Sequence, residues 1–335
     1  MTDTSPAATL DIIAIGNALV DVLSAAPDEF IAAEGLTRGA MQLIDADRAT
    51  TLYGKMGPGK EISGGSAGNT VAGAAMMGAR CAFIGQVAAD QLGEVFVHDL
   101  QSQGIAFTVP PRAADVPTGR CLVLVSPDGQ RTMNTYLGAA QFLPETALDE
   151  AQIASAKVLL LEGYLWDPLE PRAAMKAAIG MARKAGRQVA LGVSAVFCIL
   201  GHHADFTALI DDGQIDILFA NDEELIALAG LDDFEAALAA LAAKLPLLVV
   251  TRGAEGAIAI AKGERFEVSA EPVDHVVDTT GAGDLFSAGY LAGHVHGRPV
   301  ADCLRMGAVA AAEVIGHYGA RPEQDLKALV AATLG

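Results

Sequence analysis

The sequence predicts a three-layer α/β/α fold with a mostly parallel central sheet and a small β-sheet lid. Short apolar runs typical of buried strands alternate with Ala-rich helical segments, which favours a parallel sheet covered on both faces. Two stretches, residues 17–47 and 108–137, break this alternation with short runs of mixed polarity, so they can pair with each other as the lid. We expect residues 1–16, 48–107 and 138–335 to form the core.

Five apolar runs are the strands expected for the central sheet. In chain order they are LDIIAIG (10–16), KVLLLEG (157–163), QVALGV (188–193), IDILFA (215–220) and LLVVT (247–251). Their short length and aliphatic content are typical of strands buried on both faces. Residues 171–184 and 234–244 are among the helices expected between them, and Asp128-Gly129 is a hairpin turn signal within the lid.

Composition and charge argue against several classes of protein. Of the 335 residues, 52% are hydrophobic and 19% are charged, which suits a large core and does not suit a disordered chain. The 41 acidic and 22 basic residues give a net charge of −19, whereas nucleic-acid binding needs a basic face. A phosphate ligand stays possible, because backbone amides bind phosphate without net protein charge.

Cysteine usage and the N-terminus predict a soluble cytoplasmic protein. The four cysteines lie far apart without a CxxC pair, which is typical of reduced thiols. The N-terminus has neither the basic start nor the apolar run of a signal peptide. No apolar run is long enough to span a bilayer, so we expect no membrane partner.

The most informative short motif is DTTGAGD at residues 278–284, directly before an apolar stretch. One interpretation is a helix entry, in which glycine opens the turn and Asp284 lies in the first turn of the helix. The other is an anion-binding nest of backbone amides with the Asp284 carboxylate aimed into it. The motif alone does not decide between them.

A second glycine motif, SGGSAGN at residues 63–69, precedes a helix of small residues. Gly64 and Gly65 permit close backbone approach, and Ser66 can cap the helix. Asn69 lies in the first turn, where its side chain can face a ligand. Tight packing of the helix on the sheet also explains these small residues, and both interpretations can hold together.

Polar residues follow two of the predicted strands. Asn17 and Asp21 come after the first strand, where open α/β sheets bind ligands. Asn221 and Glu224 follow the strand at 215–220. This pair is either a helix cap with an acidic first turn or a site of oxygen donors for magnesium and phosphate.

Three loops bear on nucleotide binding. TRGAEG at residues 251–256 follows a strand and can pass beneath a nucleotide. GKMGPGKE at residues 54–61 has the glycine and lysine spacing of a P-loop, but Glu61 stands where Ser or Thr would bind magnesium, so we reject that interpretation. GNALVD stands where a dinucleotide-binding protein would have GxGxxG, which argues against an NAD enzyme.

Together and in this order, the motifs resemble the ribokinase-like (PfkB) family of carbohydrate and nucleoside kinases. Both signature regions match, from Gly64 to about Gly93 and at DTTGAGDLFSAGY, residues 278–290. The similarity covers nearly the whole chain, from AIGNALVD to the GHYGA loop at 316–320. It implies a ribokinase-like fold and an ATP-dependent phosphotransferase, with Mg²⁺ as a cofactor and K⁺ as a candidate one.

The resemblance also implies roles for the motif residues. Asp284 would be the base that takes the proton of the acceptor hydroxyl. The amides of Gly281, Ala282 and Gly283 would form an anion hole for the transferring phosphoryl group. Arg131 matches a lid arginine that can reach the phosphates. Thr251, Gly253 and Gly256 match part of the ATP site. Asn221 and Glu224 match the motif that acts on magnesium through water. Asp278 and Thr280 match a site for a monovalent cation.

Within the family, the chain is most similar to the adenosine-kinase branch, in GNALVD and in GGSAGN, where Ser66 replaces the Lys of many sugar kinases. This implies phosphorylation of the 5′-hydroxyl of a ribonucleoside, with adenosine favoured, and a part in purine salvage. The residues implied for nucleoside binding are Asn17, Asp21, Gln42, Gly64, Gly65, Ser66, Asn69, Leu137, Ala139 and Phe197, with Ile44, Leu124 and Leu165 as further walls for the base.

Two alternatives stay open. Thr280 stands where animal adenosine kinases carry Asn, and it is also compatible with a sugar kinase acting on ribose, fructose or a ketodeoxy sugar acid. A nucleotide-binding regulator without turnover is the other alternative, although such a protein has no need of a base at Asp284. The sequence does not predict the oligomeric state.

Overall fold

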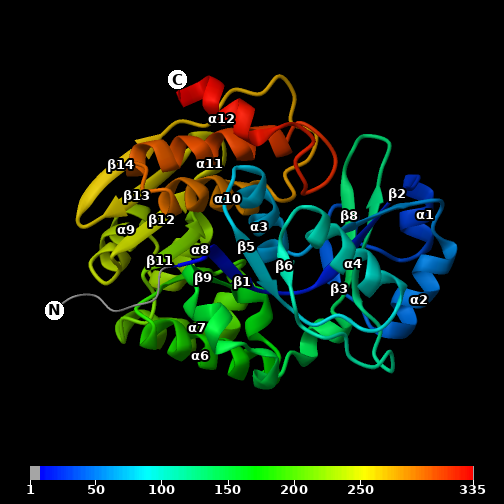
Figure 1. Ribbon diagram of the computed structural model, residues 1–335. Helices are drawn as coiled ribbons and strands as arrows, with labels where there is room; N and C mark the ends of the chain where they lie inside the picture. The colour runs from blue at the N-terminus through cyan, green and yellow to red at the C-terminus, as the bar shows by residue number, and fades with distance from the viewer. Residues whose placement is uncertain (1–7, 335) are drawn as a thin grey trace.

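A nine-stranded sheet forms the middle layer of the protein, with helices on both of its faces (Figure 1). The computed structural model describes residues 8–334. From one edge to the other, the strands are β14 (Glu264–Val268), β13 (Ala257–Ala261), β12 (Leu247–Thr251), β11 (Ile217–Asn221), β10 (Gln188–Gly192), β9 (Ala156–Glu162), β1 (Leu10–Ile15), β5 (Cys81–Ile84) and β6 (Ala106–Phe107). The strands from β12 to β6 are parallel, and β13 and β14 add an antiparallel edge.

Two groups of helices cover this sheet, one on each face. One group is α3 (Ser66–Met76), α10 (Ala282–Val295), α11 (Val300–Val314) and α12 (Leu326–Leu334), of which α11 and α12 lie above the sheet in Figure 1. The other group is α5 (Glu150–Ala154), α6 (Leu169–Lys184), α7 (Val196–Asp211), α8 (Asp222–Ala229) and α9 (Phe234–Ala242), of which α6 and α7 lie below it. Consecutive residues of the central strands are buried, as at 12–15 of β1, because helices cover both faces. The predicted three-layer α/β/α fold is confirmed.

The five predicted strands all lie in the large sheet, with ends that agree to within about two residues. The hairpin of β13 and β14 was not predicted. Its two-residue loop, Lys262-Gly263, has positive φ at both positions, as a tight hairpin turn requires. The Lys-Gly pair between two β-like runs was therefore a usable signal.

A second sheet of five strands packs beside the first, at the right of Figure 1. Its strands are, in order, β3 (Met41–Leu43), β8 (Arg131–Tyr136), β7 (Gly119–Val125), β2 (Leu19–Ala25) and β4 (Lys60–Ser63). The predicted turn at Asp128-Gly129 joins β7 and β8, and Gly129 has a φ of +85°. We call this small sheet the lid sheet. Around it lie α1 (Asp28–Ala33), α2 (Ala46–Lys55) and α4 (Gln91–Ser102).

The lid sheet contains one strand that the predicted boundaries assigned to the core. β4 pairs with β2 in antiparallel register, and α2 packs against β7 and β8. Residues 46–63 therefore go with the lid sheet. The mixed polarity of KEIS gave no strand signal, because a four-residue edge strand carries little pattern. The division of the chain into a core and a lid stays a prediction.

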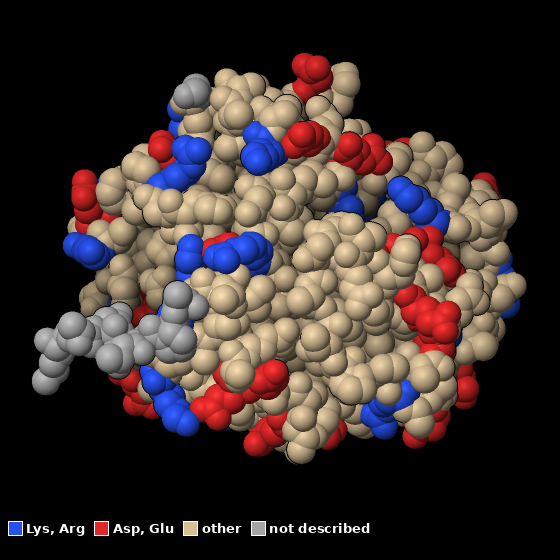
Figure 2. All heavy atoms as spheres, viewed as in Figure 1, with Lys and Arg blue, Asp and Glu red and all other residues tan. Residues whose placement is uncertain are grey.

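Within residues 8–334, no helix is both long enough and apolar enough to cross a membrane. Cys81, Cys121, Cys198 and Cys303 are free and buried. On the face shown in Figure 2, Lys and Arg side chains are scattered among Asp and Glu and do not gather in one patch.

Candidate active site

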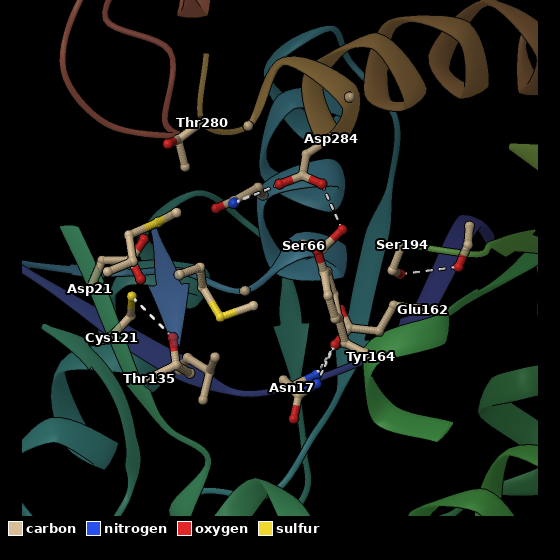
Figure 3. A pocket seen from close by; sticks show the side chains of 18 of the residues that line it. Asn17, Asp21, Ser66, Cys121, Thr135, Glu162, Tyr164, Ser194, Thr280 and Asp284 are labelled. Carbon is tan, nitrogen blue, oxygen red and sulfur yellow. Dashed lines mark hydrogen bonds between the residues drawn. The ribbon is translucent and has the colours of Figure 1, made fainter. Parts of the chain in front are cut away.

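A cavity of about 640 Å³ lies between the carboxyl ends of the large sheet's strands and the inner face of the lid sheet (Figure 3). Strands β9, β11 and β12 end at its wall with Glu162, Asn221 and Thr251. Small-molecule sites of open α/β sheets occupy this edge. The chain's topology thus brings most of the predicted polar residues to one place.

Asp284 lies at one end of the cavity, in the first turn of α10. Its Oδ1 accepts a hydrogen bond from the Ser66 hydroxyl at 2.6 Å, and its Oδ2 accepts one from Asn69 Nδ2 at 2.9 Å. Burial raises the pKa of Asp284, although these two hydrogen bonds and the nearby Arg321 oppose that change. A fixed carboxylate with a raised pKa can accept a proton from a hydroxyl group.

The turn before α10 requires glycine at its cap. Gly281 has a φ of +78°, and a Cβ there would lie 2.6 Å from the Cβ of Ala320. Within residues 8–334, the amides of Gly281 and Gly283 have no hydrogen-bond partner, and both residues line the cavity. The amide of Ala282 donates to the carbonyl of Thr279 at 3.2 Å. Of the three amides predicted to form an anion hole, the turn thus uses that of Ala282 and leaves those of Gly281 and Gly283 free within the described part of the chain, and the anion hole itself stays a prediction.

Asp21 faces the cavity from β2 and rests on the Gly64-Gly65 turn. A Cβ at Gly64 would lie 2.5 Å from the carboxylate of Asp21, and a Cβ at Gly65 would lie 2.2 Å from the carbonyl oxygen of Asn17. Burial raises the pKa of Asp21 to about 6, while Arg321 and Arg131 oppose that change. Both glycines are needed because the backbone touches the site residues directly.

Glu162 is a buried acid that the sequence analysis missed. Its Oε1 accepts hydrogen bonds from Asn17 N at 2.7 Å and Asn17 Nδ2 at 2.6 Å, and its Oε2 accepts one from Ala67 N at 2.8 Å. Burial raises the pKa of Glu162 to about 7. The residue joins the end of β1 to the start of α3. Its position could have indicated a site residue, because Glu162 is an acid at the end of the apolar run KVLLLE, which was predicted to be a strand.

Two amide oxygens in the cavity lack partners. The Oδ1 atoms of Asn17 and Asn69 are buried and accept no hydrogen bond from the described part of the chain. Their orientation is determined, because the Nδ2 atom of each donates to a carboxylate, Glu162 or Asp284. Buried acceptors are normally paired, so these two atoms indicate a ligand that offers hydroxyl or amine donors.

Arg131 and Asp278 form a buried ion pair at 2.6 Å, with side chains that are 5% and 6% exposed. Arg131 comes from the lid sheet and Asp278 from the loop before α10, so the pair joins the lid to the core. Beside it, Gly129 at the hairpin tip lies next to Tyr318. In this arrangement the lid arginine contacts the carboxylate that was predicted to bind a monovalent cation.

Asn221 and Glu224 form a reciprocal capping box at the start of α8. Glu224 N donates to Asn221 Oδ1 at 2.8 Å, and Asn221 N donates to Glu224 Oε2 at 2.9 Å. Both side chains also line the cavity, and burial raises the pKa of Glu224. The two interpretations of this motif are thus compatible in one geometry. Within residues 8–334, no group of three or more His, Cys, Asp or Glu residues could hold a metal ion.

Only one of the three residues predicted for ATP binding in the loop at residues 251–256 lies at the cavity. Thr251 lines it, whereas Gly253 and Gly256 do not. Gly256 has a φ of +93°, and a Cβ there would lie 2.0 Å from the carbonyl oxygen of Val268. This glycine therefore serves the close approach of β13 to the end of β14.

The apolar wall of the cavity follows the alternation of the lid strands. The residues of the lid sheet that line the cavity are Leu19, Asp21, Leu23, Met41, Leu43, Cys121, Val123, Arg131, Met133 and Thr135. Tyr164 and Phe197 extend this wall from the core, with ring centroids 5.9 Å apart. A planar apolar group can lie between these two surfaces.

Several predicted wall residues are corrected by this register. Gln42 points away from the cavity and its Nε2 donates to Asn134 Oδ1 at 2.8 Å, because alternate residues of a strand face opposite sides. Leu124 is displaced from the wall in the same way. Ala139 and Leu165 are fully buried and do not line the cavity, and Ile44 is partly buried and packs against the core.

Most of the predicted site residues meet at the cavity. Those that line it are Asn17, Asp21, Gly65, Ser66, Asn69, Arg131, Leu137, Phe197, Asn221, Glu224, Thr251, Thr280, Gly281, Gly283 and Asp284. Those that do not are Gln42, Gly64, Ala139, Gly253, Gly256, Asp278 and Ala282. Of the second group, Gly64 and Asp278 contact residues that do line it, namely Asp21 and Arg131.

Comparison with known proteins agrees with this geometry. A sequence profile of the pfkB family of carbohydrate kinases matches residues 39–326. The structure is similar to an adenosine kinase from Sinorhizobium meliloti, with a TM-score of 0.91 and 44% identity over 97% of this chain and 100% of that one. It is equally similar to a probable sugar kinase from Rhizobium etli CFN 42, with a TM-score of 0.91 and 43% identity over 97% of this chain and 99% of that one. An adenosine kinase of Saccharomyces cerevisiae is 27% identical over 93% of this chain and 96% of its own.

Proposed function

Because the chain belongs to the pfkB family of carbohydrate kinases, we propose that it transfers the γ-phosphoryl group of ATP to the 5′-hydroxyl of a ribonucleoside. Adenosine is the proposed acceptor and AMP the product. The observation that carries this choice is a single cavity with a buried carboxylate at one end and an apolar wall at the other. A ribonucleoside has the matching polarity, with hydroxyl groups on the ribose and a planar base.

Asp284 is the proposed general base. It would take the proton of the 5′-hydroxyl as the hydroxyl oxygen attacks the γ-phosphorus. The hydrogen bonds from Ser66 and Asn69 hold the carboxylate in place, and the amides of Gly281 and Gly283 would stabilise charge on the phosphoryl oxygens.

The unpartnered acceptors are the proposed sites for the ribose. Asn17 Oδ1 and Asn69 Oδ1 can accept hydrogen bonds from two donors, and the carboxylate of Asp21 can accept more. A ligand that pairs these buried atoms removes the cost of leaving them unpaired, which is about 1–3 kcal/mol for each. Free sugars offer the same hydroxyls, so this end of the cavity does not distinguish a nucleoside from a sugar.

The apolar wall is what favours a nucleoside. Tyr164 and Phe197 on one side, and Met133 on the lid side, enclose a space that a free sugar would not fill. Burial of an apolar surface contributes about 25 cal/mol per Å², so a buried base contributes several kcal/mol. Every ~1.4 kcal/mol corresponds to a factor of ten in affinity.

The triphosphate requires a metal ion because the cavity is acidic. Arg131 is the one Lys or Arg among the described residues that line it, and it is paired with Asp278. Mg²⁺ binds phosphate oxygens and waters together with one or two carboxylates, and Asn221 and Glu224 supply suitable oxygen atoms. When bound, the ion would neutralise charge on the phosphates. A role for K⁺ at Asp278 and Thr280 would require Arg131 to leave Asp278.

A sugar kinase is the second candidate, favoured by the similarity to the probable sugar kinase from R. etli. Side-by-side assays of ATP consumption with adenosine, other nucleosides, ribose and fructose test the choice. We expect kcat/KM for adenosine to exceed that for ribose or fructose by at least ~10³, because binding of the remote base also supports closure of the lid. A free sugar that proves the better substrate would overturn the nucleoside proposal and leave the role of Asp284 unaffected.

A further inference from the structure

Arg321 connects three parts of the chain that are distant in sequence, and no motif or role above includes it. It lies in the loop between α11 and α12. Its Nε donates to the carbonyl oxygen of Ser63 at 2.9 Å, its Nη2 donates to Ser63 Oγ at 2.9 Å, and its Nη1 donates to the carbonyl oxygen of Gly68 at 2.9 Å. One guanidinium group thus binds three oxygen atoms.

These oxygen atoms lie on either side of the connection between the lid and the core. Ser63 is the last residue of β4 in the lid sheet, and Gly68 lies in the first turn of α3. Between them are only Gly64 and Gly65 and the beginning of the helix. A pair of glycines is conformationally permissive by itself, so contacts from elsewhere must determine its geometry. Arg321 supplies such contacts to both sides.

The same connection contacts both acids of the proposed reaction, Asp21 of β2 and Asp284 of α10. Gly64 touches the carboxylate of Asp21, and the first turn of α3 holds Asp284 through Ser66 and Asn69. A shift of the connection would therefore move Asp21 relative to Asp284. Misplacement of reacting groups by about 1 Å can lower a rate by about 10².

From these contacts we propose that Arg321 is a positioning residue, which fixes the lid-to-core connection and so holds the acceptor between Asp21 and Asp284. The proposal rests on the proposed function, since it takes Asp21 and Asp284 as the groups that bind and activate the acceptor.

Electrostatics favour the same role. The side chain lies near three carboxylates, those of Asp21, Asp99 and Asp284, and it opposes the rise in the pKa of Asp21 and of Asp284 that burial causes. Burial lowers the pKa of Arg321 itself to about 10, so the guanidinium stays charged at neutral pH. A positive charge here reduces the repulsion between the two site acids.

The geometry requires arginine rather than another cation. The planar guanidinium presents several N–H donors in fixed directions and meets three acceptors on two elements. A lysine ammonium group retains the charge but is a compact donor on a flexible stem. Arg321→Lys should therefore preserve only part of the function, which separates the effect of charge from that of positioning.

The experiment compares Arg321→Met and Arg321→Lys with Arg305→Met, an exposed arginine of α11 that donates to the carbonyl of Thr333. Isothermal titration measures the Kd of adenosine and of ATP for each folded variant, and kinetics gives kcat and KM. We expect Arg321→Met to weaken adenosine binding by at least ~10-fold and to lower kcat, because three hydrogen bonds from a charged group are lost. The Kd of ATP should change by less than ~2-fold, since Asn221 and Thr251 lie on other strands. For Arg321→Lys, the Kd of adenosine and kcat should lie between those of Arg321→Met and the wild type. Arg305→Met should match the wild type in both.

Ser63→Ala provides a milder test that also applies if Arg321→Met does not fold. It removes one of the three acceptors and should weaken adenosine binding by about 2- to 5-fold. In a protein that already carries Arg321→Lys, its effect should be smaller, because part of the interaction is already absent. Equal effects in the two backgrounds would contradict the proposal.

Hydrogen exchange separates this proposal from the proposed function. Arg321→Lys, and Arg321→Met where it folds, should accelerate amide exchange in residues 62–69 without any acceptor present, and leave α8 unchanged. Unaltered exchange there, an equal loss of ATP and adenosine binding, or a lower Tm with unchanged Kd values would overturn the role of Arg321. A wild-type protein that binds no adenosine would instead overturn the acceptor assignment, and the exchange result would still decide the role of Arg321.

Discussion

The two ends of the cavity are organised differently. At the core end, Asp284 is held by hydrogen bonds from Ser66 and Asn69, and a glycine of positive φ determines the turn before it. At the lid end, the side chains that face the cavity are those that the alternation of β3, β7 and β8 turns inward. A single substitution should therefore lower activity strongly at the core end. At the lid end the effect should be weaker, and it should depend on which face of the strand the side chain occupies.

The largest effect is expected from Asp284→Asn. The amide cannot accept the proton of the acceptor hydroxyl, so kcat should fall by at least ~10²-fold, the usual scale for a general base. ATP binding and the fold should be retained. Asp232→Asn, at an exposed acid before α9, is the matched control. Near-normal kcat in a folded Asp284→Asn protein would remove Asp284 from the mechanism.

The pH profile tests the same end of the cavity without a substitution. Asp284 has a raised pKa and that of Asp21 is about 6, in both cases because of burial, and both must be ionised to bind and activate the acceptor. Since both pKa values lie above that of a free carboxyl group, kcat/KM should fall as the pH drops through about 6. The decrease should reach up to about tenfold per pH unit for each proton that the site binds. Because the two acids titrate together, this acidic side of the pH profile reports on both of them and not on either one alone. A profile that stays level down to about pH 5 would contradict their assignment.

Glu224→Gln is expected to have a moderate effect. If Glu224 holds magnesium through water, the magnesium concentration needed for half-maximal activity should rise about 10-fold, with a smaller change in adenosine KM. Glu223→Gln changes the exposed neighbour and is the control. Titrations of activity against magnesium that coincide for the two variants would leave only the helix-cap role for Glu224.

The smallest effects are expected at the lid, where neighbouring positions differ. Met41→Ala removes a side chain from the inner face and should lower kcat/KM for adenosine about 3- to 10-fold through lost contact. Gln42→Ala, on the other face, should change it less than about 2-fold. Steady-state kinetics of the pair tests the strand register directly. The opposite order of effects would mean that β3 presents Gln42 to the substrate.

The sequence predicted the core end of the cavity better than the lid end. The residues around Asp284 belong to local motifs, and the structure brings Ser66 and Asn69 of one motif together with Asp284 of another. The lid wall was predicted partly wrong, because a one-residue difference in strand register exchanges the two faces. Gln42 and Leu124 were expected at the wall, and their sequence neighbours are there instead.

Two further residues escaped sequence reasoning for a different reason. Glu162 and Arg321 act through contacts with residues that are far away in the chain, Asn17 for the first and Ser63 for the second. Nothing near either position in the sequence signals these partners. The short strand β4 escaped as well, because four residues of mixed polarity carry little periodicity. Long-range contacts of this kind become visible only when the fold is known.

The measurement that tests the central claim most directly uses 5′-deoxyadenosine. This compound retains the base and the ribose 2′- and 3′-hydroxyls but lacks the hydroxyl proposed to face Asp284. We predict that it binds the cavity through its base and its two remaining hydroxyls, and that it is not phosphorylated. It should inhibit the phosphorylation of adenosine competitively, with an inhibition constant within about tenfold of the KM of adenosine. Its phosphorylation, seen as a new phosphate ester by ³¹P NMR, or the absence of any inhibition at millimolar concentration, would contradict the account.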